Sequence, residues 1–126
     1  MNTIIEIQKW FQKQCNGEWE HSQGIIIETC DNPGWWVRIN IKGTTLENKP
    51  FEMVSENVPQ EFIDQALGLV KAPFTCAEPS SEYWLICYIK DNEFNGVGDP
   101  SRLSQILKIF LDWANNKISN QKIQRT

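Results

Sequence analysis

Residues 24–42, GIIIETCDNPGWWVRINIK, carry the clearest pattern in the chain, that of a β-hairpin. The run IIIETC (25–30) is rich in β-branched residues, and WWVRINIK (35–42) alternates between two faces. One face holds Trp35, Val37, Ile39 and Ile41, and the other holds Trp36, Arg38, Asn40 and Lys42. Between the runs, Asp31 or Asn32 can bond the backbone ahead, Pro33 fixes φ, and Gly34 tolerates a positive φ. The two runs therefore form an antiparallel pair of strands.

Three segments around this hairpin have helical spacing. Residues 3–15 repeat apolar side chains on one side, with Thr3 as a plausible N-cap and Asn16-Gly17 as the stop. Residues 59–71, PQEFIDQALGLVK, give a weaker helix because Gly68 interrupts it. The last helix begins with Asp99 as N-cap and Pro100 as first residue. Its apolar stripe, which predicts core positions, consists of Leu103, Ile106, Leu107, Phe110, Trp113 and Ala114.

The remaining segments complete an α+β domain. FEMVSE (51–56) predicts a short strand, and YWLICYIK (83–90) predicts a central strand because it is apolar on both faces. NEFNGVGDP (92–100) predicts a glycine-spaced turn with one short strand around Phe94. KAPFTCAEPSSE (71–82) is loop by composition, and residues 117–126 should fray. We expect a single domain over residues 1–126, an antiparallel sheet of four or five strands packed with an N-terminal and a C-terminal helix.

The charge distribution indicates the kind of partner. The chain has 126 residues and a net charge of -4. Three of its 12 Lys and Arg residues follow residue 116 without any acid, so the rest has nine against 16 acids, or -7. Such a body should bind nucleic acid poorly, because phosphate binding needs clustered Lys and Arg. It would suit a basic protein partner.

The cysteines and the N-terminus favour a cytoplasmic protein. Cys15, Cys30, Cys76 and Cys87 form no CxxC pair and fit no common zinc pattern. Glu6 and Lys9 interrupt the apolar run that a signal peptide needs, and no segment is long enough to span a membrane. We therefore expect four free thiols in a cytoplasmic protein.

The sequence offers little chemistry for catalysis. With one histidine and scattered cysteines, a metal site is disfavoured. GVGDP (96–100) lacks the GKS or GKT of a phosphate loop, and its glycines suit backbone roles. We expect no enzyme, no cofactor and no metal.

The exception is GEWEHSQG (17–24), which concentrates Glu18, Trp19, Glu20 and His21. On an extended segment the two carboxylates would point one way, and Trp19 and His21 the other. Three interpretations stay open: a ligand-binding or catalytic pocket using Glu18, Glu20 and His21, a solvated strand edge, or a surface for recognition. Trp36, which shares a face with Arg38, is an interface anchor if that face is open and a core residue if a helix covers it.

Three runs resemble the immunity protein 53 family: WEHSQGIIIETCDNPGWWVRI (19–39), LENKPFE (46–52) and FNGVGDPSRLSQILKIFLDW (94–113). The similarity covers residues 10–52 and 82–114, while residues 57–80 look like an insertion.

The resemblance implies a small bacterial protein that binds and neutralises a cognate polymorphic toxin by covering its active site. It implies a basic toxin domain, such as a nuclease, as the partner. The expected toxin-binding residues are Glu18, Trp19, Glu20, His21, Trp36 and Arg38. The alternatives are the pocket of Glu18, Glu20 and His21, and a structural adaptor with an incidental acidic face.

Overall fold

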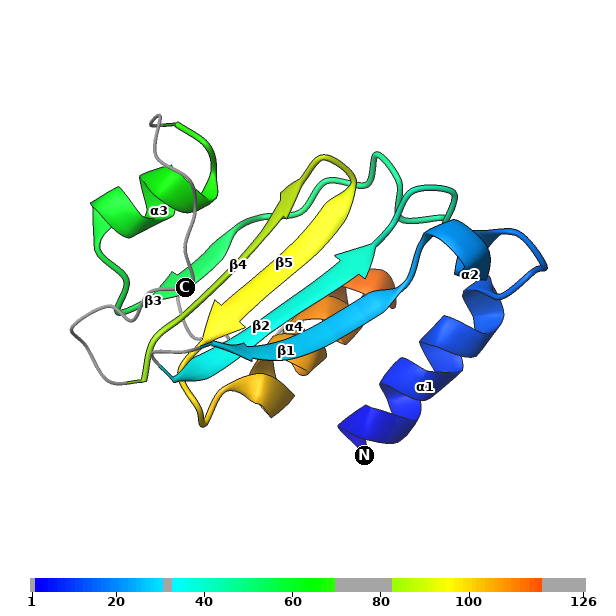
Figure 1. The fold of residues 1–126 in the computed structure, drawn as a ribbon, viewed down its shortest axis with the longest axis horizontal. Coiled ribbons are helices and arrows are strands. Elements are labelled where there is room, and N and C mark those ends of the chain that lie inside the picture. The colour runs from blue at the N-terminus through cyan, green and yellow to red at the C-terminus, as the bar shows by residue number, and fades with distance from the viewer. Residues whose placement is uncertain (1, 31–32, 70–82, 117–126) are drawn as a thin grey trace.

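The computed structural model describes residues 2–30, 33–69 and 83–116, which form an antiparallel sheet with helices on both faces (Figure 1). The strands are β1 (Ile25–Cys30), β2 (Gly34–Asn40), β3 (Val54–Glu56), β4 (Leu85–Lys90) and β5 (Glu93–Gly98). The helices are α1 (Thr3–Gln14), α2 (Trp19–Ser22), α3 (Gln60–Ala66) and α4 (Leu103–Ala114). The strand order is β1-β2-β5-β4-β3, and each neighbouring pair is antiparallel. The predicted α+β class is confirmed.

The β1–β2 hairpin is confirmed, with Ile27 opposite Val37. The reason that position 34 requires glycine differs from the one expected. Gly34 belongs to β2, and a Cβ built on it would lie 2.6 Å from the carbonyl oxygen of Gly98. Glycine is therefore required here by the close approach of two backbones, and not by a positive φ.

The strand predicted around Phe94 is confirmed, but the glycine-spaced turn predicted for the rest of residues 92–100 is wrong. A six-residue strand, β5, replaces the expected glycine-spaced turn and lies at the centre of the sheet. The turn before it is only Asp91 and Asn92, whose φ angles of 53° and 60° suit a tight hairpin. A Cβ built on Gly96 would lie 2.3 Å from Cγ2 of Ile106, so the glycine lets α4 pack closely on β5.

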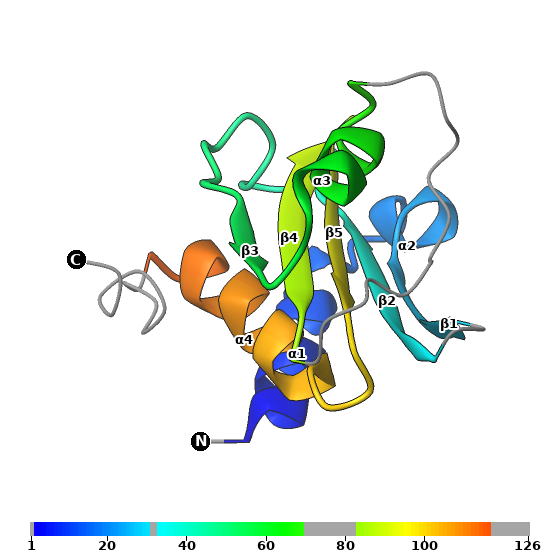
Figure 2. The ribbon, with the colours of Figure 1, turned by 90° about the vertical axis from the view of Figure 1, so that its left-hand side faces the viewer.

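Two hydrophobic cores lie on opposite sides of the sheet (Figure 2). Helices α1 and α4 cover one side, and the shorter α3 packs on the other. Strand β4 supplies both cores, because Leu85 and Cys87 belong to the first and Ile86 and Tyr88 to the second. This confirms the prediction of a strand covered on both faces.

Two helices begin at residues other than those predicted. The N-cap of α1 is Asn2 instead of Thr3, and its side-chain oxygen accepts a hydrogen bond from the Ile4 N–H at 2.9 Å. Helix α4 begins at Leu103, because Asp99 Oδ1 accepts bonds from the Ser101 N–H at 2.8 Å and its hydroxyl at 2.6 Å. Those bonds build a separate turn ahead of the helix.

Trp113 contributes to the core only in part. Its side chain is half-buried, with its ring edge-on to Phe51 and Phe110 at 5.3 Å and 6.0 Å. Its indole N–H donates to the carbonyl oxygen of Pro50 at 2.7 Å. The ring therefore joins α4 to the segment before β3.

The segment that looks like an insertion contributes to the second core. Its first half contains α3, as predicted, and Gly68, with φ 75°, follows the helix. Phe62 and Ile63 are buried in the same cluster as Trp84. Residues 70–82 and 117–126, expected to be loop and frayed tail, lie outside the described residues.

The prediction of four free thiols is wrong at Cys30, which forms a disulfide. Cys15 and Cys87 are free, and Cys87 is fully buried. Cys76 lies outside the described residues. The spacing of cysteines along a chain does not report their distance in space, so the sequence argument had no means of detecting this bond.

Candidate functional site

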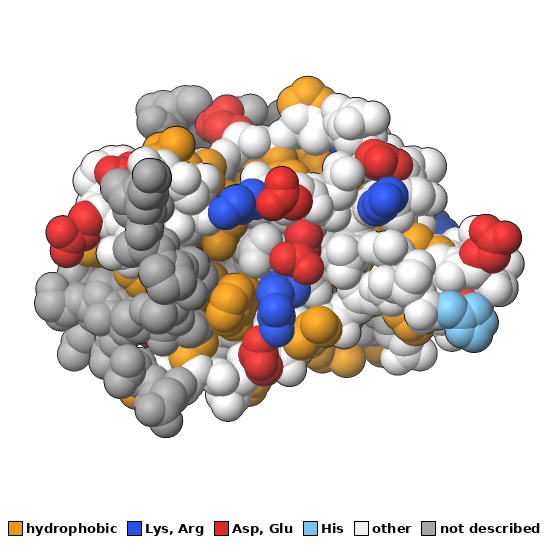
Figure 3. Space-filling view, turned by 45° about the horizontal axis from the view of Figure 1, so that its top comes forward, with side chains coloured by type: hydrophobic (Ala, Val, Ile, Leu, Met, Phe, Trp, Pro, Cys, Tyr) orange, Lys and Arg blue, Asp and Glu red, His pale blue; other side chains and the backbone are white. Residues whose placement is uncertain are grey.

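Most side chains on one half of a sheet face are exposed or partly exposed, and we call this half the open face. It consists of Ile26 and Glu28 of β1, Trp36, Arg38 and Asn40 of β2, and Glu93 and Asn95 of β5. Helix α3 packs over the other half of the same face, on β4 and β3. Acidic and basic side chains gather along the middle of this face, with hydrophobic side chains beside them (Figure 3).

Two of the sequence-predicted residues, Trp36 and Arg38, lie together on the open face. The Arg38 guanidinium forms an ion pair with Glu28 and lies 4.7 Å from the centre of the Trp36 ring. The Trp36 indole N–H donates to the side-chain oxygen of Asn95 at 3.1 Å. The group is therefore held in one arrangement before any partner arrives, which lowers the entropy lost on binding.

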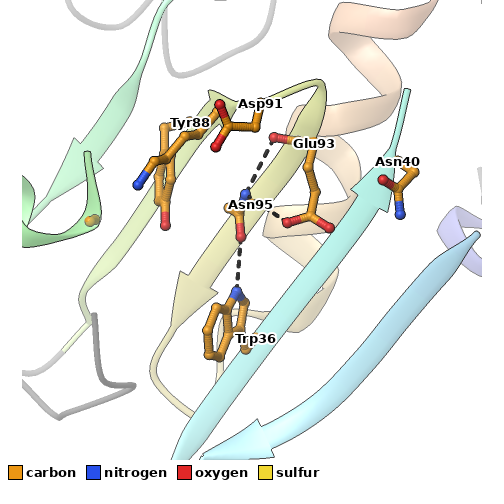
Figure 4. A pocket seen from close by; sticks show the side chains of 8 residues that line it. Trp36, Asn40, Tyr88, Asp91, Glu93 and Asn95 are labelled. Atoms are coloured by element: carbon orange, nitrogen blue, oxygen red, sulfur yellow. Dashed lines mark hydrogen bonds between the residues drawn. The ribbon is translucent and has the colours of Figure 1, made fainter. Parts of the chain in front are cut away.

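A cavity of about 300 Å³ opens on the open face beside this group (Figure 4). Its lining consists of Trp36, Asn40, Ala66, Tyr88, Lys90, Asp91, Glu93 and Asn95. The least exposed polar side chains of this lining belong to Tyr88 and Asn95, which are 3% and 5% exposed. Burial, together with the nearby Glu93 carboxylate, raises the pKa of Tyr88 to about 12. The Tyr88 hydroxyl therefore keeps its proton to a higher pH than an ordinary tyrosine does.

The stretch GEWEHSQG (17–24) is not extended, and the side-chain directions expected from an extended segment are wrong. Residues Trp19–Ser22 form one helical turn, α2. The Asn16 side-chain oxygen accepts from the N–H groups of Glu18 and Trp19 at 2.9 Å and 3.0 Å. The Glu20 carboxylate in return accepts from the Asn16 N–H at 2.9 Å. This reciprocal pairing resembles a capping box, which a search for alternation does not detect.

The four candidates in this stretch consequently occupy different environments. Trp19 is a core residue, 5% exposed and packed edge-on against Trp10 at 5.9 Å. Hydrogen bonds from the backbone N–H groups of Glu20 itself and Asn16 hold the pKa of Glu20 below its ordinary value. His21 is exposed, with Nε2 4.0 Å from Glu20, and Glu18 is exposed.

A second cavity, of about 330 Å³, lies beside α2 and is lined by Asn16, Glu18, Trp19, Ser22, Gln23, Lys42 and Gly43. Glu20 and His21 do not line it, so the structure does not bring Glu18, Glu20 and His21 into one pocket. The two cavities are connected along the chain. Asn40, the last residue of β2, lines the first cavity, and Lys42, in the turn that follows, lines the second.

Sequence reasoning missed Tyr88, Asp91, Glu93 and Asn95, because it assigned residues 92–100 to a turn and gave Tyr88 no role beyond its strand. One signal could have found them. YWLICYIK and EFNGVG flank the pair Asp91-Asn92, a common two-residue hairpin turn, and this arrangement places Tyr88 opposite Asn95.

Metal and membrane features are not found in the part of the chain that the structure describes. Within residues 2–30, 33–69 and 83–116, His, Cys, Asp and Glu side chains form no group of three or more that could hold a metal ion. Among the same residues, no helix has the length and apolar character needed to cross a bilayer.

The fold is that of a small α+β domain. One half of one face of its sheet, the open face, is not covered by a helix among the described residues. The chain belongs to the immunity protein 53 family, because the family model described as immunity protein 53 matches residues 4–115. Membership implies an immunity protein that protects against a toxin. A search of curated proteins and a search of solved structures found no match.

Proposed function

We propose that this protein neutralises its cognate toxin by binding it non-covalently through the open face and covering the toxin's active site. The observation that carries the proposal is the arrangement of Trp36, Arg38 and Glu28 beside the cavity. An aromatic ring and an arginine, held in place and flanked by a cavity, are the residue types that supply most of the binding energy at protein interfaces.

The charge of the chain supports a basic toxin domain, such as a nuclease. Residues 1–116 carry -7, and a negative surface accelerates association with a positive partner. Of the sequence-predicted contacts, we propose Trp36, Arg38, Glu18 and His21 as direct ones. Trp19 and Glu20 would act by supporting α2, because one is buried and the other is bonded to the backbone.

The protein needs no catalytic group for this role, and we propose that it has no enzymatic activity. We also propose that it acts in the cytoplasm. Disulfides are uncommon in the reducing cytoplasm, so the bond at Cys30 argues against this placement and makes a direct test necessary. Fractionation of the producing cell tests it, and recovery of the protein from the periplasm would contradict the placement.

The test of function uses the toxin domain encoded beside this gene, co-expressed with the protein in a host that the toxin kills. The wild-type chain should restore growth, and Asn40→Arg, which adds a bulky cation to the cavity lining at the end of β2, should not. Gln12→Arg is the matched control, because Gln12 is exposed on α1, against the opposite side of the sheet. Loss of growth with the wild-type chain, or equal protection by both variants, would contradict the proposal.

A further inference from the structure

The Tyr88 side chain is buried, but its hydroxyl oxygen reaches the space of the cavity and has no partner among the described residues. The side chain is 3% exposed, and the hydroxyl makes no hydrogen bond to any residue within 2–30, 33–69 or 83–116. Figure 4 shows the side chain projecting into the cavity of the open face. A tyrosine hydroxyl can both donate and accept, and this one has its hydrogen-bonding capacity free on the cavity side. The oxygen is therefore placed to accept a bond from a group that enters.

The lining of the cavity also contains two carboxylates, which accept hydrogen bonds, beside the amides of Asn40 and Asn95. Asp91 is in the β4–β5 turn and Glu93 begins β5, and both line the cavity. Asn95 Nδ2 already points to Glu93, at 3.3 Å from its carbonyl oxygen and 3.4 Å from Oε1. The carboxylates of Asp91 and Glu93 can therefore still accept hydrogen bonds from a bound partner.

The one cation in the lining, Lys90, is directed to another place. A Cβ built on Gly68 would lie 2.8 Å from the Lys90 ammonium nitrogen, which therefore lies just beyond the C-terminal end of α3. The carbonyl groups at a helix end favour a cation. The exposed Lys90 side chain lies at this wall, and among the described residues neither Asp91 nor Glu93 forms an ion pair with it or with another cation.

The aromatic wall is compatible with a second guanidinium. Arg38 already lies 4.7 Å from the centre of the Trp36 ring, which shows that this ring accommodates a planar cation. A guanidinium presents five donors in a fixed plane, whereas an ammonium is a compact and strongly hydrated point charge. A set of separated acceptors beside an aromatic ring matches the guanidinium better.

We propose that this cavity receives one arginine side chain of the bound toxin, whose guanidinium donates to Asp91, Glu93 and the Tyr88 hydroxyl. The inference rests on the proposed function, because it names the chemistry of the partner at the same surface. It adds Tyr88, Asp91 and Glu93 to the binding residues, none of which sequence reasoning selected.

The first test needs no toxin. Ethylguanidinium is titrated into the isotope-labelled protein while NMR records the Trp36 indole N–H and the Asn95 side-chain amide. We expect saturable shifts at both, with butylammonium binding more weakly. The double variant Asp91→Asn/Glu93→Gln should weaken ethylguanidinium binding by about tenfold or more. Glu61→Gln is the control, because Glu61 is an exposed carboxylate of α3 outside the cavity. Shifts that do not saturate, or that persist unchanged in the double variant, would overturn the inference.

The second test measures affinity for the toxin domain encoded beside the gene. Tyr88→Phe removes one oxygen and keeps the buried ring, and it should raise Kd by roughly three- to tenfold through faster dissociation. Asp91→Asn/Glu93→Gln should raise Kd further, and Glu61→Gln should not. If the toxin binds the wild-type chain and the cavity variants equally well, the inference fails and the proposed function stands. If the toxin does not bind the wild-type chain, the proposed function itself fails.

Discussion

The indole N–H of Trp36 donates to the side-chain oxygen of Asn95 at 3.1 Å, and this bond joins β2 to β5 across the open face. Asn95 is 5% exposed and Trp36 is partly buried, so truncating Asn95 would remove this partner from the indole N–H. We predict that Asn95→Ala lowers the free energy of unfolding by about 1–3 kcal/mol. Urea denaturation of wild type and variant measures the difference. A stability equal to that of wild type would show that the bond contributes nothing to the fold.

The glycines of β5 allow a second prediction about the fold. Gly96→Ala should destabilise by about 1–3 kcal/mol or more, since its Cβ would lie 2.3 Å from Cγ2 of Ile106. Gly24→Ala is the matched control, because a Cβ there meets no atom within 4 Å. Thermal melting should show a large decrease for the first variant and little change for the second. Equal melting temperatures would mean that α4 does not lie on Gly96.

Tyr88 should make stability fall at alkaline pH. Its pKa is about 12 in the folded protein, against an ordinary value of 10, so unfolded chains lose this proton first. The contribution is complete below pH 10 and is lost as pH rises from 10 to about 12, a total of roughly 2–3 kcal/mol. Denaturation of wild type and Tyr88→Phe at pH 9 and pH 11.5 isolates the effect. The same decrease in both proteins would assign it to other groups.

The two glutamates of the GEWEHSQG stretch should behave differently on charge reversal. Glu20→Lys should lower the melting temperature, because it removes the acceptor of the Asn16 and Gly17 N–H groups at 2.9 Å and 2.8 Å. Glu18→Lys should leave the melting temperature unchanged and slow association with the toxin, an effect that added salt reduces. If Glu20→Lys is as stable as Glu18→Lys, the capping role of Glu20 is incorrect.

The sequence was informative where one periodicity dominates. Val37 and Ile39 alternate with polar residues, and the hairpin and its buried side follow directly from them. The sequence was uninformative where a residue type is typical of two kinds of structure. Gly96 and Gly98 in EFNGVG look like turn residues, but they are a strand surface shaped by the Ile106 and Arg102 side chains of another element. Information about such a contact lies in the packing of distant segments, which a local pattern cannot contain.

The same distinction applies to the candidate site. Trp36 and Arg38 could be assigned to one face by alternation alone, and the structure places them in contact. Glu20 and Trp19 could not be interpreted correctly, because their environment depends on the Asn16 side chain and on the ring of Trp10. Tyr88 and Glu93 became candidates only when β4 and β5 were seen to pair around Asp91-Asn92.

The most direct test of the central claim is hydrogen–deuterium exchange of the protein alone and in complex with its toxin domain. If the open face covers the toxin, exchange should slow in β1, in β2 and in the turn of Asp91-Asn92, while α1 and the exposed side of α4 remain unchanged. Protection confined to α1 and α4, with β1 and β2 exchanging as in the free protein, would contradict it.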